Sequence, residues 1–292
     1  MIAIECEGIS KSFGNAKALE NVSCALEEGK IYALLGRNGA GKTTLLNCLC
    51  TKYLPDCGEI KILEEKAYEN EKVLSEICFL SDYLDAFTTK KVNNILKFAS
   101  TFYPKWDNEL MERLLAFFEI NKKSKYDALS KGRQTAVSIV IGLCSGCQVV
   151  LLDEIYSGLD AVARQGFYQI LLSEQEKNPR TFVLSTHLIE EMSGLFDHVV
   201  MIDKGKVILD EEIEGLHEKA YKCIGRAEYE RYLQGKNVIC KKQAGAVMEY
   251  DIYGELTWEE QKKLEECGFG IDHLSLQELF VAFTADSIKE WR

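Results

Sequence analysis

Gly36-Arg37-Asn38-Gly39-Ala40-Gly41-Lys42-Thr43-Thr44 lies between a short apolar run of strand character, residues 30–35, and a run of helical character, residues 44–50. Glycines between a buried strand and a helix let the backbone curl so that several N–H groups face one concavity, and the helix N-terminus adds partial positive charge. The stretch therefore predicts an anion site. Its G-x-x-x-x-G-K-[ST] spacing is that of a phosphate loop.

The residues of this loop have separate expected roles. Lys42 is expected to reach the β- and γ-phosphates of a nucleotide, and the hydroxyl of Thr43 to complete the coordination of Mg²⁺. The alternative is a glycine-rich connection between two packed elements, but the spacing, the preceding strand and the following helix favour the phosphate loop. The predicted nucleotide-binding residues of the loop are Gly36, Arg37, Asn38, Gly39, Ala40, Gly41, Lys42, Thr43 and Thr44.

The composition narrows the classes of function. A chain of 292 residues is long enough for about two domains. Its net charge of -11 argues against nucleic acid as a partner, because proteins that bind the phosphate backbone cluster Lys and Arg. No apolar run reaches the ~18 residues of a membrane-spanning helix, and residues 1–7 lack the pattern of a signal peptide. We therefore expect a cytosolic protein.

The odd number of cysteines, 11, fits a reducing compartment in which most of them are small buried residues. Cys144 and Cys147 have the C-x-x-C spacing of a redox or zinc half-site. No second pair or nearby histidine completes a set of four ligands, and a buried strand follows directly. Packing is therefore the favoured interpretation of this pair.

Two further apolar runs of strand character end in side chains suited to nucleotide chemistry. Residues 148–152 lead into Asp153 and Glu154, and residues 181–186 lead into His187. Nucleotides bind where the carboxyl ends of parallel strands meet. Asp153 is expected to hold Mg²⁺, Glu154 to polarise the attacking water, and His187 to act at the same edge. The alternatives are solvated turn residues and an ordinary surface histidine.

The rest of the chain indicates three additions to this core. Residues 2–30 predict a small antiparallel sheet, in which Phe13 either stacks on a purine or belongs to the core. Residues 88–128 have amphipathic helical periodicity. They are followed by Leu129-Ser130-Lys131-Gly132-Arg133, where Ser and Gly at a helix start predict a second anion-binding N-terminus. Residues 212–292 predict a small α+β unit with an apolar helix at 274–283.

In this order, the phosphate loop, residues 129–133, residues 149–154, Ser157-Gly158-Leu159-Asp160 and His187 resemble the motifs of the ATP-binding subunit of ABC transporters over roughly residues 1–210. The resemblance implies an α/β fold: a P-loop NTPase core with a small antiparallel β subdomain, an inserted helical subdomain at about 84–143 that carries the signature, and a small C-terminal α+β appendage. The expected domains are an ABC ATPase domain, 1–217, and an accessory or regulatory domain, 218–292.

The resemblance also implies how the protein would work. ATP and Mg²⁺ would bind at the interface of a head-to-tail dimer, formed by two identical subunits or by this chain and a paralogous ATPase subunit. Hydrolysis would drive a separate transmembrane permease, so the chain would lie at the cytoplasmic face of the cell membrane as a peripheral protein. Ser130 and Gly132 would contact the γ-phosphate across the dimer, Asp160 would join the two sites, His187 would sense the γ-phosphate and Phe13 would stack on adenine. The expected catalytic residues are Lys42, Glu154 and His187, and the expected metal ligands are Thr43, Asp153 and Asp82.

The chain departs from the family pattern in three places. Asp82, or alternatively Ser81, stands where the family has a Gln that faces the metal and water. An acid there keeps an oxygen but loses the amide donor. Lys131 stands where the signature usually has Gly. Ile155-Tyr156 replaces Pro-Thr after Glu154, which removes a rigid turn residue but leaves both acids in place, so catalysis should survive.

The segment Phe102-Tyr103-Pro104-Lys105-Trp106-Asp107, together with Lys131, resembles a subgroup of bacterial exporters that handle antibiotics or peptides. In that subgroup the cytoplasmic helices of the permease would dock near Tyr83, Leu84 and Phe87.

Two other classes of function remain as alternatives. The first is a soluble ABC-type ATPase acting on ribosomes, DNA or cluster assembly. The single cassette, the acidic charge and the absence of a long heptad insertion and of zinc spacing disfavour its ribosome-factor and DNA-repair versions. A regulatory cassette that binds nucleotide without hydrolysis is kept open by Asp82 and Lys131.

Overall fold

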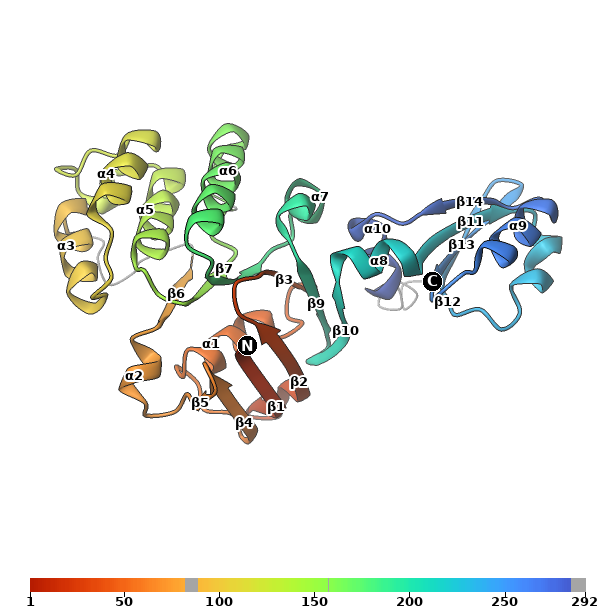
Figure 1. The fold of residues 1–292 in the computed structure, drawn as a ribbon, viewed down its shortest axis with the longest axis horizontal. Coiled ribbons are helices and arrows are strands. Elements are labelled where there is room, and N and C mark those ends of the chain that lie inside the picture. The colour runs from red at the N-terminus through yellow and green to blue at the C-terminus, as the bar shows by residue number, and fades with distance from the viewer. Residues whose placement is uncertain (82–88, 157, 285–292) are drawn as a thin grey trace.

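The computed structural model describes residues 1–81, 89–156 and 158–284 (Figure 1). Its centre is a six-stranded sheet in the order β10-β9-β3-β8-β7-β6. Neighbouring strands from β9 to β6 are parallel, and β10 pairs with β9 in the antiparallel direction. Every residue of β3, β7 and β8 is buried, as expected for parallel strands covered on both faces. The strands are β3 Ile31–Leu35, β6 Ile77–Ser81, β7 Val149–Asp153, β8 Thr181–Ser185, β9 His198–Asp203 and β10 Lys206–Glu212.

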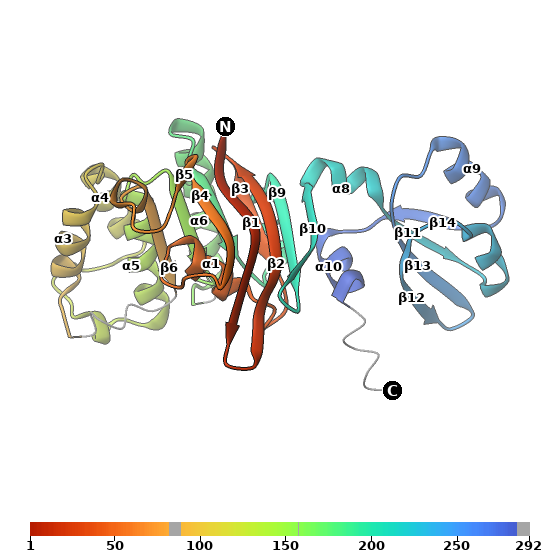
Figure 2. The ribbon, with the colours of Figure 1, turned by 90° about the horizontal axis from the view of Figure 1, so that it is seen from below.

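Residues near the start of the chain form a second sheet, with strand order β2-β1-β4-β5. Its two long strands form an antiparallel hairpin that turns at Gly14 and Asn15, with Phe13 paired to Ala16. The predicted small antiparallel sheet is therefore present, and it packs beside β10 and β9 (Figure 2). The strands are β1 Ile2–Phe13, β2 Ala16–Glu27, β4 Cys57–Ile62 and β5 Glu65–Lys66.

Helices cover the central sheet and form the inserted helical block. The amphipathic segment 88–128 contains two helices, α3 and α4, which lie beside α5 at the end of the molecule away from the C-terminal unit (Figure 1). The remaining helices of the first 212 residues are connected directly to strands of the central sheet. The bounds are α1 Lys42–Leu49, α2 Glu71–Leu74, α3 Val92–Phe102, α4 Asn108–Phe117, α5 Lys131–Cys144, α6 Ala161–Lys177 and α7 Ile189–Met192, with 3₁₀ turns at Tyr126–Ala128 and Ser193–Leu195.

The C-terminal unit has its own four-stranded sheet, in the order β12-β13-β11-β14, with antiparallel neighbours throughout. It also has a small hydrophobic cluster of its own around Tyr250 and Phe269. Leu279 of its last helix is buried in the main core instead. The division at residues 217 and 218 therefore stays a prediction. The elements are α8 Ile213–Lys219, β11 Ala220–Gly225, a 3₁₀ helix Ala227–Leu233, β12 Val238–Ala244, β13 Val247–Tyr253, α9 Trp258–Glu266, β14 Gly270–His273 and α10 Leu276–Thr284.

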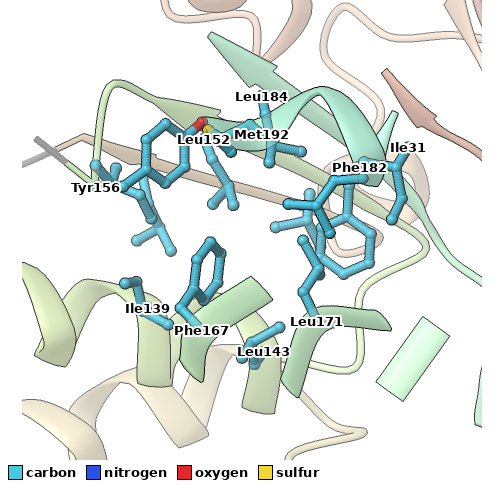
Figure 3. Packing of buried hydrophobic residues seen from close by; sticks show 14 of the residues in the cluster. Ile31, Ile139, Leu143, Leu152, Tyr156, Phe167, Leu171, Phe182, Leu184 and Met192 are labelled. Carbon is cyan, nitrogen blue, oxygen red and sulfur yellow. The ribbon is translucent and has the colours of Figure 1, made fainter. Parts of the chain in front are cut away.

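The main core lies between the central sheet and the helices α5 and α6 (Figure 3). Phe167 of α6 is fully buried there among side chains such as Leu152 and Tyr156, which come from β7 and the turn after it. This layer fixes the strand ends from which the site is built.

Cys144 and Cys147 belong to the same core. Both are free thiols, and burial raises the pKa of Cys147 to about 12. A thiol buried in this way is a weak nucleophile and a weak metal ligand. Their surroundings thus agree with the packing interpretation.

Candidate active site

The phosphate loop connects β3 to α1, and two of its glycines occupy positions that no other residue fits. Gly41 precedes α1 with φ 114°, and a Cβ there would lie 2.6 Å from the carbonyl oxygen of Ala18. A Cβ on Gly36 would lie 2.5 Å from the carbonyl oxygen of Ile202. The loop is therefore pressed against β2 and β9, which holds its N–H groups at the start of α1.

Lys42 lies at the centre of this loop. Only 5% of the residue is exposed, and its Nζ atom donates to the carbonyl oxygens of Gly36 at 2.7 Å and Arg37 at 3.4 Å. The ammonium group is also 3.5 Å from Oε1 of Glu154. Thr43 beside it is exposed. The other loop residues divide into exposed Arg37, Asn38 and Gly39, partly exposed Gly41 and Thr44, and buried Gly36 and Ala40.

Asp153 and Glu154 stand at the end of β7. Asp153 is 8% exposed, and among the described residues its Oδ1 atom has no hydrogen-bond partner. Glu154 has φ 52°, a left-handed conformation that costs a residue with a side chain about 1–3 kcal/mol. Its N–H donates to the carbonyl oxygen of Ser185 at 3.1 Å. Such a strained backbone persists only where the surrounding structure holds the residue in place, and strained residues cluster at active sites.

His187 completes a cluster at the carboxyl edge of the sheet. Its Nδ1 atom is 3.5 Å from Oε2 of Glu154, so the carboxylate lies between the imidazole and the ammonium group of Lys42. These three side chains follow β8, β7 and β3, which are adjacent in the sheet. The predicted catalytic residues Lys42, Glu154 and His187 are thus brought together.

A cavity of about 510 Å³ opens over the loop. It is lined by residues 36–40, His187, the turn at Asp203 and Lys204, and Phe280 of α10. The apolar pattern of residues 274–283 predicts a helix but does not predict its position beside this cavity. Phe280 reaches the cavity because α10 packs against α7 (Figure 1). Helix α7 begins two residues after His187.

Ser130, Gly132 and Asp160 line a different cavity, of about 400 Å³. The hydroxyl of Ser130 caps α5 by accepting the N–H of Arg133 at 3.4 Å, and the carboxylate of Asp160 caps α6 by accepting the N–H of Ala163 at 2.8 Å. A Cβ on Gly132 would lie 2.8 Å from the carbonyl oxygen of Gly158, so the two turns are packed together. This cavity shares no lining residue with the one over the phosphate loop.

Phe13 lies at the end of β1 and is 47% exposed. Its ring meets the ring of Tyr53 edge to face, with centroids 5.3 Å apart, and Nζ of Lys11 lies 5.7 Å from its centroid. The core alternative for Phe13 is therefore wrong. Stacking on adenine stays a prediction.

The oxygens present fit a magnesium ion that is shared with phosphates. Asp153 offers the buried Oδ1 atom described above, and Thr43 offers an exposed hydroxyl at the start of α1. Residues 1–81, 89–156 and 158–284 contain no cluster of three or more acidic, His or Cys side chains that would hold a metal alone. The third predicted ligand, Asp82, lies outside the described residues, as do Tyr83, Leu84, Phe87 and Ser157.

The comparisons with known proteins bear on this arrangement. The family model described as ABC transporter matches residues 19–157. An uncharacterized ABC transporter ATP-binding protein of Methanocaldococcus jannaschii is 34% identical over 74% of this chain and 80% of its own length. A SkfA peptide export ATP-binding protein of Bacillus subtilis is 28% identical over 75% and 93%. A methionine import ATP-binding protein of Clostridium tetani is 27% identical over 73% and 70%.

Solved structures agree on the fold. The ATP-binding subunit of an ABC transporter superposes on 74% of this chain and 92% of its own with a TM-score of 0.66 and 23% identity. The predicted α/β architecture of a P-loop NTPase is thereby confirmed. With this fold, the phosphate loop and the strand-end acids in place, and a relative above 30% identity along most of its length, the chain belongs to the ATP-binding proteins of the ABC transporter family and is an ATPase.

Proposed function

We propose that the chain hydrolyses ATP as one half of a head-to-tail dimer, in which each ATP lies between the phosphate loop of one subunit and the Ser130–Gly132 surface of the other. The observation that carries the proposal is the division of the site residues over two surfaces. Lys42, Glu154 and His187 gather on one, whereas Ser130, Gly132 and Asp160 line another. Two copies related by a twofold axis bring each surface to its complement.

The residues on the loop side then have distinct tasks. The ammonium group of Lys42 binds the β- and γ-phosphates, since a buried cation hydrogen-bonded to carbonyls keeps a fixed position. Glu154 orients the attacking water and accepts its proton. Thr43 and Asp153 would hold Mg²⁺, and the ion would neutralise part of the phosphate charge. His187, next to Glu154, contacts the γ-phosphate.

Mixing two inactive variants tests the head-to-tail arrangement. Lys42→Ala disables the loop side, and Ser130→Asp keeps a helix cap while placing a negative charge against the γ-phosphate. Each variant alone is expected to be inactive. An equimolar mixture is expected to recover at most about a quarter of wild-type turnover, because half of the randomly formed dimers are hybrids with one intact site of two. No recovery at all would argue against a site shared between subunits.

The proposed partner of the dimer is a separate transmembrane permease. No helix in residues 1–81, 89–156 and 158–284 is long and apolar enough to cross a bilayer. We place the chain at the cytoplasmic face of the cell membrane, where closing and reopening of the ATP dimer moves the permease. Recovery of the chain with a membrane protein, rather than with ribosomes or DNA, distinguishes this function from a soluble ABC-type ATPase.

The proposed direction is export. Relatives with export and with import in their names both match the chain. The direction therefore rests on residues 102–107 and Lys131, the features that resemble the exporter subgroup.

We further propose that the C-terminal unit regulates ATP hydrolysis through α10. Phe280 forms a wall of the cavity over the phosphate loop, so a shift of α10 changes the space for a nucleotide. Deleting residues 218–292 would strip Leu274 and Leu279 from the main core, which makes a point substitution the better test.

Phe280→Ala is expected to change the KM for ATP about twofold to fivefold, because it removes apolar surface from the cavity wall. Val281→Ala is the matched control, since Val281 is the next residue of α10 and does not line the cavity. Steady-state ATPase kinetics measure both. Equal kinetics for the two variants and the wild type would leave this regulatory role without support.

A further inference from the structure

The turn after β7 departs from the family pattern at Ile155 and Tyr156, and both residues are buried beneath the site. Ile155 has 0% and Tyr156 has 1% of its surface exposed. The ring of Tyr156 stacks on the ring of Phe167 from α6, with centroids 5.9 Å apart and an angle of 23° between the planes (Figure 3). The turn is therefore anchored in the core by an aromatic side chain instead of being stiffened by proline.

The hydroxyl of Tyr156 joins two parts of the site. It donates a hydrogen bond of 3.1 Å to the carbonyl oxygen of Ser185, the oxygen that also accepts the N–H of Glu154 at 3.1 Å. Ser185 is the last residue of β8 and lies two residues before His187. One carbonyl group thus ties the turn that carries Glu154 to the turn that carries His187. Burial raises the pKa of Tyr156 well above its ordinary value, so the hydroxyl remains a donor at neutral pH.

Tyr156 also connects the site to the other surface of the chain. Its carbonyl oxygen accepts the N–H of Leu159 at 3.1 Å, directly before Asp160. A left-handed residue such as Glu154, with φ 52°, persists only where several contacts hold it. On the main-chain side, Glu154 is held by its own N–H bond to Ser185 and by the anchored turn that follows it.

We propose that Tyr156 is a positioning residue for ATP hydrolysis: its hydroxyl and buried ring hold Glu154 at the correct distance from Lys42 and His187. The inference rests on the proposed role of Glu154 in orienting water. Tyr156 does not itself face either cavity described above. It acts through the main chain of Ser185 and Glu154.

Tyr156→Phe tests this role in the full-length chain, because it removes the hydroxyl and keeps the ring. The variant is expected to fold, since the Ser185 carbonyl keeps one donor and the stacking on Phe167 is unchanged. The expected result is a kcat about tenfold lower, with the KM for MgATP within about twofold of the wild type. A purely structural role would instead appear as a lower melting temperature with unchanged kcat.

Tyr168→Phe is the matched control. Tyr168 packs on the same Phe167 ring, and its buried hydroxyl has no hydrogen-bond partner among the described residues. It is expected to leave kcat unchanged. If the wild type hydrolyses ATP, an unchanged kcat in Tyr156→Phe would overturn the inference. An equal loss of kcat in both variants would overturn it as well. A wild type without turnover would overturn the proposed function and this inference together.

Discussion

Lys42→Ala is expected to weaken ATP binding about a hundredfold or more. The ammonium group is the buried cation at the centre of the phosphate loop, held by the carbonyl oxygens of Gly36 and Arg37. Removing it deletes charge-assisted hydrogen bonds to phosphate, which contribute about 1.5–3 kcal/mol each. It also leaves the Glu154 carboxylate without its neighbouring cation, 3.5 Å away, so the empty site becomes more negative. Isothermal titration with ATP measures the loss.

Lys204 supplies the control for this experiment. It lines the same cavity but is exposed, and its φ of 47° makes asparagine, which tolerates that conformation, a better replacement than alanine. Lys204→Asn is expected to bind ATP within about threefold of the wild type. Wild-type affinity in Lys42→Ala would contradict the assignment of the phosphate loop.

Glu154→Gln is expected to lower turnover about a hundredfold to ten-thousandfold while ATP binding persists. The amide has the shape of the carboxylate but does not accept a proton at neutral pH. Because hydrolysis is what reopens the proposed dimer, the variant is expected to accumulate as an ATP-bound dimer. Size-exclusion chromatography with and without ATP measures the association.

The control for Glu154→Gln is a carboxylate outside the cluster. Glu190 is exposed on α7, three residues after His187. Glu190→Gln has the same change of charge, and it is expected to hydrolyse ATP at the wild-type rate and to stay monomeric when the ATP is consumed. A Glu154→Gln variant that remains monomeric and hydrolyses ATP normally would remove Glu154 from the mechanism.

The parts of the site that the sequence predicts are those with a local signal. The glycines at positions 36 and 41 are required because the backbone there lies too close to neighbouring strands for a side chain to fit. The strand-end positions of Glu154 and His187 follow from the apolar runs before them, because parallel strands deliver their carboxyl ends to one edge.

Two residues at the site, Phe280 and Tyr156, have no local sequence pattern that predicts their place there. Phe280 reaches the phosphate loop only through the packing of α10 on α7, more than 200 residues after the loop in the chain. In the sequence, Tyr156 is only a departure from the Pro-Thr pattern of the family. Its proposed positioning role follows from the hydrogen bond that its hydroxyl donates to the Ser185 carbonyl, which only the structure shows. Contacts between distant segments depend on tertiary packing, which residue spacing does not encode.

Hydrolysis of MgATP by the purified wild type and by Glu154→Gln, with the molecular mass of both followed in the same samples, tests the central claim most directly. We predict turnover in the wild type, and in the variant a dimer that persists as long as ATP is present. If neither protein hydrolyses ATP while both bind it, even after reconstitution with the proposed permease, the chain senses nucleotide and the account of a hydrolytic dimer is contradicted.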